Sequence, residues 1–144
     1  MKFFRYGILA GVLVVLDRAT KIVFIRGADF QFSLLHLGLF ENHGLVFSLP
    51  ASTAVSLLVM SIAMVLVSVI LVRAARRHNW SLVIAMSLIL LGALSNVLDR
   101  LAYGFVIDFV SFGRWFPIFN LADLMIAAGL VVWLRDLTRT KKTT

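Results

Sequence analysis

The residues most able to do chemistry in this chain are carboxylic acids that lie within apolar sequence. Asp108 is the one charged residue between Gly104 and Phe112, so we expect its carboxyl group to be desolvated, which raises a carboxyl pKa unless a cation is near. Asp123 lies in a second apolar stretch. Two carboxylates that share one proton can act as general acid and general base. Nothing in the spacing alone requires these two to meet.

Two Asn–Asp pairs share the spacing N-x-x-D, Asn96 with Asp99 and Asn120 with Asp123. Residues three apart lie on one face of a helix, so each Asn can donate hydrogen bonds near its Asp. Such pairs either join helices through interhelical hydrogen bonds or support a reaction centre, and both interpretations stay open. Arg100 directly follows Asp99, and an Asp–Arg pair would fix the end of that helix.

Asp17 and Lys21 are spaced i, i+4, which puts them on one helix face where their charges can pair. The pair either neutralises itself within the helix or contacts a substrate. Arg18 points away from this face, and we expect it to reach toward the outer surface or a loop.

The composition indicates that a lipid bilayer surrounds these residues. Of the 144 residues 61% are hydrophobic and 15% charged, whereas a soluble domain is about 45–50% apolar and about 25% charged. The mean hydropathy is +0.99. The absence of Cys and the low Gly and Pro contents exclude a disulfide-rich module, a collagen-like fibre and a disordered chain.

Four apolar stretches predict four transmembrane helices, each long enough for a hydrocarbon core of about 30 Å. They cover residues of about 4–25, 51–72, 80–98 and 118–134. We therefore predict an all-α membrane protein, with residues 1–144 forming one integral membrane domain. Its outer loops, about 26–50 and 99–117, would hold a small extracytoplasmic β-like region, because residues 32–39 show two short period-2 runs with a phase break typical of strands with a bulge.

The distribution of Lys and Arg predicts the orientation of the spans. Nine lie on the side of the two termini and three on the other, which places both termini in the cytoplasm. The net charge of +7 is then a topological signal and does not indicate nucleic-acid binding. Residues 2–16 also resemble the start of a cleaved signal peptide, but no small-residue cleavage site follows. We therefore expect that this segment is not cleaved and forms the first transmembrane helix. His36 and His43 predict no metal site, because Cys and H-x-x-x-H spacing are absent.

Four blocks of the sequence resemble the motifs of the lipoprotein signal peptidases (signal peptidase II), which are intramembrane aspartic proteases of bacteria. The blocks are Asp17-Arg18-Ala19-Thr20-Lys21, Asn42-His43-Gly44-Leu45-Val46-Phe47, Asn96-Val97-Leu98-Asp99-Arg100 with Gly104, Val106, Asp108 and Phe109, and Phe119-Asn120-Leu121-Ala122-Asp123. They are similar to the family's D-x-x-x-K, N-x-G-A-x-F, N-x-x-D-R…G-x-V-x-D-F and F-N-x-A-D elements. The chain departs from the family at Ser95, where Gly is common, and at Leu45 and Val46, where the family has small residues.

The resemblance implies roles for the matching residues. Asp108 and Asp123 fall on the catalytic dyad of the family. The other motif residues would support the site or contact the substrate: Asp17, Lys21, Asn42, Gly44, Asn96, Asp99, Arg100 and Asn120. The resemblance implies neither a metal ion nor an organic cofactor.

The implied function is removal of signal peptides from bacterial prolipoproteins whose lipobox Cys carries diacylglycerol, by cleavage on the N-terminal side of that Cys. The implied partners are these precursors and the lipid bilayer, and we expect a monomer in the bacterial cytoplasmic (inner) membrane with its site toward the outer leaflet. Two other interpretations remain. The chain could be a small proton-coupled membrane transporter, because intramembrane carboxylates also relay protons. It could also be a non-catalytic membrane scaffold, which would keep its function when any Asp is changed to Asn.

Overall fold

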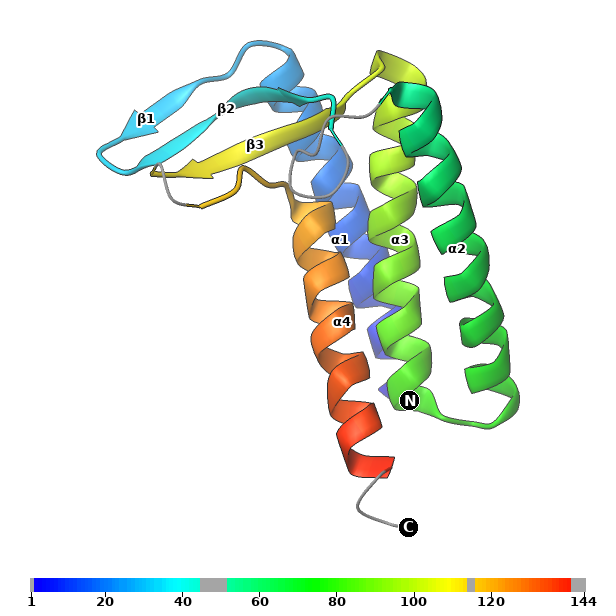
Figure 1. The fold of residues 1–144 in the computed structure, drawn as a ribbon. Helices are drawn as coiled ribbons and strands as arrows, with labels where there is room; N and C mark the ends of the chain where they lie inside the picture. The colour runs from blue at the N-terminus through cyan, green and yellow to red at the C-terminus, as the bar shows by residue number, and fades with distance from the viewer. Residues whose placement is uncertain (1, 45–51, 114–115, 141–144) are drawn as a thin grey trace.

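The computed structural model describes residues 2–44, 52–113 and 116–140 as four helices and three strands. In chain order these are α1 (Lys2–Ile25), β1 (Phe30–Phe32), β2 (Leu35–Asn42), α2 (Thr53–Arg76), α3 (Trp80–Tyr103), β3 (Val106–Phe112) and α4 (Leu121–Thr140). The helices lie side by side, and α3 contacts α1, α2 and α4 (Figure 1). The sheet lies at one end of the helices and projects to one side, while α1 begins and α4 ends at the opposite end (Figure 1).

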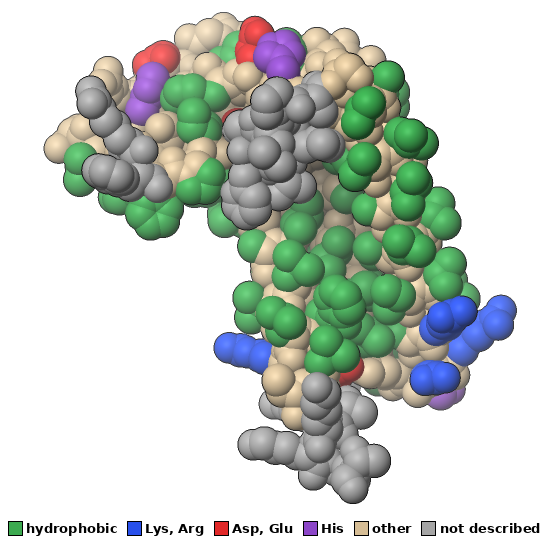
Figure 2. All heavy atoms as spheres, in the orientation of Figure 1, with side chains coloured by type: hydrophobic (Ala, Val, Ile, Leu, Met, Phe, Trp, Pro, Cys, Tyr) green, Lys and Arg blue, Asp and Glu red, His purple; other side chains and the backbone are tan. Residues whose placement is uncertain are grey.

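Two helices, α2 and α3, are long and apolar enough to cross a membrane by length and composition. Among the described residues α1 and α4 do not pass this test, because each carries several ionisable residues. Both nevertheless expose large apolar side chains, such as Val15 of α1 and Leu134 of α4. In a space-filling view, hydrophobic side chains cover much of the visible face of the helices between the Lys and Arg side chains at one end and the sheet at the other (Figure 2).

Two glycines bring α3 and α4 into close contact. A Cβ added at Gly92 would lie 2.5 Å from the backbone oxygen of Ala122, and one added at Gly129 would lie 2.6 Å from that of Ala85. Small residues at such points let helix backbones approach closely, as is common between membrane helices. The close approach at Gly92 holds the start of α4 against the C-terminal half of α3.

The helices occur where the sequence predicts them, but several ends are shifted: α2 continues to Arg76 and α4 to Thr140, beyond the predicted ends at 72 and 134. The third helix was expected to end near residue 98, but α3 continues to Tyr103 and ends at Gly104, whose φ of 84° is accessible to Gly. Asp99 and Arg100 are therefore helical and do not lie in a loop of 99–117. The fourth helix begins at Leu121 and not at 118, because Phe119 pairs with β3 before the helix starts.

The predicted β-like region is a three-stranded antiparallel sheet in the order β1-β2-β3. The phase break at residues 34–35 marks the turn between β1 and β2. The bulge lies further along, between Leu37, which pairs with Val110, and Phe40, which pairs with Asp108. Two residues of β2 there oppose one residue of β3, which is the geometry of a bulge.

Candidate active site

Asp108 is the third residue of β3, and its side chain is 1% exposed. Two contacts anchor this strand to the helices. The ring of Phe109 stacks on Phe24 of α1 with 5.1 Å between ring centroids, and the backbone N–H of Ile107 donates to Oδ2 of Asp99 at 3.3 Å. The strand therefore holds Asp108 at the sheet end of the helices.

A short backbone pairing brings the start of α4 to Asp108. The N–H of Phe119 donates to the oxygen of Val110 at 3.0 Å, and the N–H of Val110 donates to the oxygen of Phe119 at 2.9 Å. Asn120 follows directly, and its Nδ2 donates to Oδ1 of Asp108 at 2.6 Å. The pairing of segments on either side of residues 114–115 thus places Asn120 beside the carboxyl group.

Asn120 also caps α4 together with Asp123. The N–H of Asp123 donates to Oδ1 of Asn120 at 2.9 Å, and the N–H of Asn120 donates to Oδ2 of Asp123 at 3.2 Å. This reciprocal pattern is a capping box, so the N-x-x-D spacing here starts a helix. Asp123 is consequently the third residue of α4, nearer the helix end than a helix beginning at residue 118 would place it. Asn120 links the carboxyl groups of Asp108 and Asp123.

Each of the two carboxyl groups has one further amide donor. Nδ2 of Asn42 donates to Oδ2 of Asp108 at 2.8 Å, while Oδ1 of Asn42 accepts from the N–H of Gly44 at 3.0 Å. Nδ2 of Asn96 donates to Oδ1 of Asp123 at 2.8 Å. The pair Asn96–Asp99 therefore differs from the pair Asn120–Asp123, since Asn96 donates to Asp123 on another helix and not to the Asp three residues along its own helix.

A buried ion cluster, formed by Asp17, Arg18, Lys21 and Asp99, contacts the amide of Asn96 on the side away from Asp123. Lys21 is fully buried, and its Nζ lies 3.0 Å from Oδ2 of Asp17, 2.7 Å from Oδ2 of Asp99 and 3.0 Å from Oδ1 of Asn96. Arg18 forms an ion pair with the other oxygen of Asp99. Two acids and two bases thus neutralise one another, which a buried set of charges requires.

This cluster corrects two sequence-based expectations. Arg18 was expected to point outward or to a loop, but it pairs with Asp99, because α3 extends far enough to place that acid beside α1. Arg100 was expected to pair with Asp99 at the helix end. Instead it donates to the backbone oxygen of Gly44 and lies 3.3 Å from Sδ of Met60, since it faces α2 and the loop.

One residue that sequence reasoning did not assign to the site belongs to the cluster. Oγ of Ser95 donates to Oδ2 of Asp17 at 2.5 Å, and the backbone oxygen of Ser95 accepts from Arg18 at 3.1 Å. The other oxygen of Asp17 accepts from the N–H of Ala122 at 2.9 Å. The sequence feature that could have identified Ser95 as a site residue is its position directly before the motif residue Asn96, where Gly is common in the family.

The surroundings of Asp108 favour its protonated form. Burial raises the pKa of Asp108 from 3.8 to about 7, and the neighbouring charge of Asp123 adds to the increase. The hydrogen bonds from Asn42 and Asn120 and the charge of Lys21 act in the opposite direction. An acid that holds its proton near neutral pH can donate a hydrogen bond to a substrate oxygen while its partner acts as a base.

All ten residues predicted for the site are described, and eight of them meet around the two carboxyl groups or in the ion cluster behind them. Gly44 and Arg100 lie at the edge of this group, where Arg100 donates to the backbone oxygen of Gly44. The departures from the family at Leu45 and Val46 lie outside the described residues. His36 and His43 contact Asp29 and Glu41. Within the described ranges no three His, Cys, Asp or Glu side chains gather as metal ligands would.

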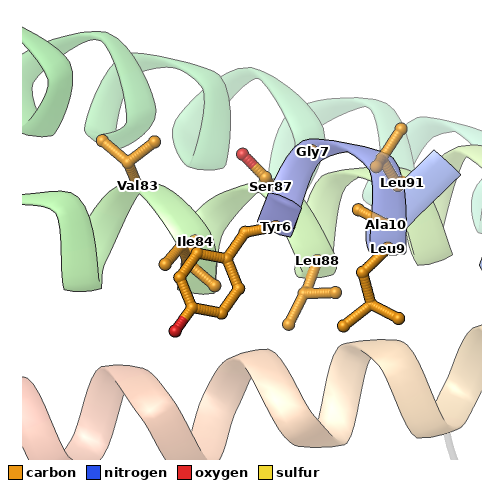
Figure 3. A pocket seen from close by; sticks show the side chains of 9 residues that line it. All are labelled: Tyr6, Gly7, Leu9, Ala10, Val83, Ile84, Ser87, Leu88 and Leu91. Carbon is orange, nitrogen blue, oxygen red and sulfur yellow. The ribbon is translucent and has the colours of Figure 1, made fainter. Parts of the chain in front are cut away.

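An apolar cavity of about 320 Å³ lies elsewhere, between α1 and α3 (Figure 3). Its lining consists of Tyr6, Gly7, Leu9, Ala10, Val83, Ile84, Ser87, Leu88 and Leu91. Asp17 lies about 10 Å further along α1 than Ala10. The lining contains no ionisable carboxyl or amine, so the cavity is separate from the candidate site.

The sequence and fold match known proteins over most of the chain. Residues 9–139 match the sequence model of the family described as Signal peptidase (SPase) II. The chain is 37% identical to a lipoprotein signal peptidase of Pseudomonas fluorescens (strain Pf0-1), over 94% of this chain and 88% of that protein. It is 31% identical to one of Clostridium tetani, over 83% of each.

Two solved structures share the fold, and both are titled as bacterial membrane enzymes determined by the in meso method. One, at 2.3 Å resolution, has a TM-score of 0.80 and 24% identity over 97% of this chain and 91% of its own. The other, at 1.9 Å resolution, has a TM-score of 0.73 and 26% identity over 92% of each chain. With the family match covering nearly the whole sequence, the chain belongs to the signal peptidase II family.

Proposed function

We propose that this chain removes signal peptides from prolipoproteins and that Asp108 and Asp123 are its catalytic dyad. The observation that carries the assignment is that Asn120 donates hydrogen bonds to both carboxyl groups, from its side chain to Asp108 and from its backbone to Asp123. The remaining site residues support this pair. The amides of Asn42 and Asn96 orient the carboxyl groups, and the ion cluster of Asp17, Lys21 and Asp99 holds α1, α3 and α4 together around them.

The chemistry requires one ionised and one protonated carboxyl group. The ionised Asp takes a proton from water as the water oxygen attacks the scissile carbonyl carbon, and the protonated Asp donates its proton to the carbonyl oxygen. When the C–N bond breaks, the leaving nitrogen takes the proton from the first Asp, and a hydroxyl proton of the intermediate returns to the second. Two properties of Asp108 support one protonated and one ionised carboxyl group. Its burial disfavours its charged form, and the neighbouring charge of Asp123 opposes a second ionisation.

The substrate of the proposed reaction is a prolipoprotein whose Cys bears diacylglycerol, cut on the N-terminal side of that Cys. A substrate that is itself a lipid-anchored membrane helix can reach the site laterally, since the bilayer fixes its depth and orientation. The exposed apolar surfaces of the helices support lateral access through lipid.

We propose that all four helices span the membrane as one domain covering residues 1–144. For α2 and α3 the support is their length and hydropathy. For α1 and α4 it is the pairing of their ionisable residues: Asp17 and Lys21 are buried within the bundle, while apolar side chains such as Val15 and Leu130 face outward. A bilayer excludes unpaired charges far more strongly than paired ones.

We further propose that both termini are cytoplasmic, that the membrane is the bacterial inner membrane and that the site faces the outer leaflet. The support is the nine-to-three distribution of Lys and Arg, some of which, such as Lys141 and Lys142, lie outside the described residues. A reporter fused after Thr144 should be active only in the cytoplasm. Activity in the periplasm contradicts this orientation.

Neither rival interpretation gains support. A proton-coupled transporter needs ionisable groups spread through the membrane depth, whereas the buried acids of the described chain gather near the sheet end. The similar proteins are peptidases. We expect a monomer, because one chain supplies every residue of the proposed site, and sedimentation of the detergent-solubilised protein measures this.

The reaction is tested with purified chain in detergent and two precursors. We expect cleavage of a diacylated prolipoprotein, with the Cys as the new N-terminus, and no cleavage of the same precursor without lipid. Equal cleavage of both precursors contradicts the proposed substrate, and cleavage of neither contradicts the proposed activity.

A further inference from the structure

Three asparagine amides surround the dyad, and the carbonyl oxygen of each is occupied by a hydrogen-bond donor. Oδ1 of Asn42 accepts from the N–H of Gly44 at 3.0 Å, and Oδ1 of Asn120 from the N–H of Asp123 at 2.9 Å. Oδ1 of Asn96 accepts from Nζ of Lys21 at 3.0 Å. An ammonium or backbone N–H can only donate, so these contacts determine which end of each amide faces the dyad. All three therefore direct Nδ2 toward the carboxyl groups.

Each of the four carboxyl oxygens accepts one N–H bond. For Asp108 the donors are Asn120 and Asn42, both through Nδ2. For Asp123 the donors are Nδ2 of Asn96 and the backbone N–H of Asn120. The number of hydrogen bonds consequently does not distinguish the two groups, and any difference between them must come from their wider surroundings.

Three features of those surroundings favour a negative charge on Asp123 over Asp108. Asp123 is the third residue of α4, where the positive end of the helix dipole stabilises an anion, whereas Asp108 lies on a strand. Asn96, which donates to Asp123, accepts a hydrogen bond from the fully buried ammonium of Lys21, so the positive charge polarises this donor. Asp123 is also partly exposed, while Asp108 is 1% exposed.

We infer that Asp123 is the ionised general base, that Asp108 holds the proton of the dyad, and that Asn96, oriented by Lys21, is the positioning residue that determines this division. The inference rests on the proposed function and assigns roles within it. The raised pKa of Asp108, about 7 through burial and the charge of Asp123, agrees with it. In the reaction Asp123 then takes the proton from water, and Asp108 donates its proton to the carbonyl oxygen.

Carboxyl ¹³C resonances of aspartate-labelled protein in detergent micelles test the assignment of the proton. Spectra of Asp108→Asn and Asp123→Asn identify the two signals, because each variant lacks one of them. At about pH 6, below the pKa of about 7 of Asp108, we expect the Asp108 signal to be that of a protonated acid and the Asp123 signal that of a carboxylate. The opposite pattern overturns the inference.

The pH dependence of cleavage tests the role of Asn96. The acid limb of kcat/KM reports the general base of the free enzyme. Loss of one hydrogen bond to a charged group in Asn96→Ala should move this limb to higher pH by about one unit. Asn79→Ala is the matched control, because Nδ2 of Asn79 likewise donates to a carboxyl group of α4, that of Asp136 at 2.9 Å, but at the opposite end of α3 from the dyad. It should lower thermal stability without moving the limb.

The outcomes separate this inference from the proposed function. Full cleavage by Asp108→Asn or Asp123→Asn contradicts the proposed dyad itself. Loss of cleavage in both, together with an unshifted acid limb in Asn96→Ala, leaves the dyad in place and overturns the role of Asn96. If Asn96→Ala does not fold, the resonances of the unsubstituted protein still decide which carboxyl group is protonated.

Discussion

Asn120 and Asp123 form two reciprocal hydrogen bonds. The backbone nitrogen of Asn120 lies 3.2 Å from Oδ2 of Asp123, and the backbone nitrogen of Asp123 lies 2.9 Å from Oδ1 of Asn120. The same Asn120 side chain donates to Asp108 at 2.6 Å. One residue therefore starts α4 and joins carboxyl groups that come from a strand and a helix. Because of this double use, the start of the helix and the geometry of the dyad cannot change independently.

The two uses of Asn120 can be separated by substitution. Asn120→Ser keeps a good N-cap residue, but its hydroxyl oxygen lies one bond nearer the backbone than the amide nitrogen of Asn and does not reach Asp108 from the capping position. We expect a thermal midpoint near that of the unsubstituted protein and a cleavage rate roughly 10- to 100-fold lower, as for one lost hydrogen bond to a charged group. Asn120→Ala should lose the same rate and also about 1 kcal/mol of stability through the lost cap. Equal rates for Asn120→Ser and the unsubstituted protein would refute the link to Asp108.

The stability of the protein should depend on pH through Asp108. Its pKa is about 7 in the folded state and 3.8 when unperturbed, so the folded state holds this proton more tightly. The stabilising contribution is full below about pH 4 and is lost as pH rises through 7. Asp108→Asn lacks this group, so its free energy of unfolding should fall less between about pH 5 and 8, by an amount on the order of 2 kcal/mol. Denaturation of both proteins over a pH series measures the difference, and parallel curves count against a raised pKa.

Asp99 should matter more for stability than Asp17. Asp99 forms ion pairs with both Lys21 and Arg18, whereas the one cation that pairs with Asp17 is Lys21. Each acid also accepts hydrogen bonds, Asp99 from the N–H of Ile107 and Asp17 from Ser95 and the N–H of Ala122, so the second cation makes the difference. Breaking a buried ion pair costs about 3–5 kcal/mol, which we expect for Asp99→Asn. Asp17→Asn leaves Lys21 with Asp99 and should cost less. Thermal unfolding in detergent compares the two, and a larger loss for Asp17→Asn contradicts this reading of the cluster.

The close approach of α3 and α4 should control the rate as well as the stability. In Gly92→Ala the new Cβ would meet the backbone oxygen of Ala122 at 2.5 Å, so the helices must separate near Asn96 and Asp123. We expect a loss of about 1–3 kcal/mol, as for overpacked cores, together with slower cleavage per folded molecule. Gly11→Ala is the control, since no atom lies within 4 Å of its added Cβ and Ala favours a helix. Normal cleavage by Gly92→Ala would show that the spacing of the helices does not position the dyad.

The general organisation of the chain could be predicted from its sequence because it depends on local properties. Apolar length and hydropathy predict helices at the four places where they occur, and a period-2 pattern at residues 32–39 predicts strands where β1 and β2 lie. It does not predict β3, which lies in the expected loop of 99–117. The family followed from motif residues and their order, and the comparisons confirm it. The roles of the individual site residues stay predictions.

The contacts that make the site depend on long-range geometry that the sequence does not reveal. Asp108 meets Asn120 because Phe119 pairs with Val110 and because Phe109 stacks on Phe24. Neither contact follows from spacing. The expectation for Arg18 was wrong for a related reason, since its partner Asp99 lies on another helix whose length and rotation are set by packing.

The central claim is that Asp108 and Asp123 act as one catalytic unit. The most direct measurement is the initial rate of cleavage of a diacylated prolipoprotein per folded molecule, for Asp108→Asn, Asp123→Asn and the double variant. Asn keeps the shape and a hydrogen-bonding group but cannot serve as a general base or hold the shared proton. We expect each single variant to lose cleavage while remaining folded, with the double variant no worse than either, because residues that act as a unit are non-additive. A rate above about a few per cent of the unsubstituted protein in either single variant contradicts the dyad.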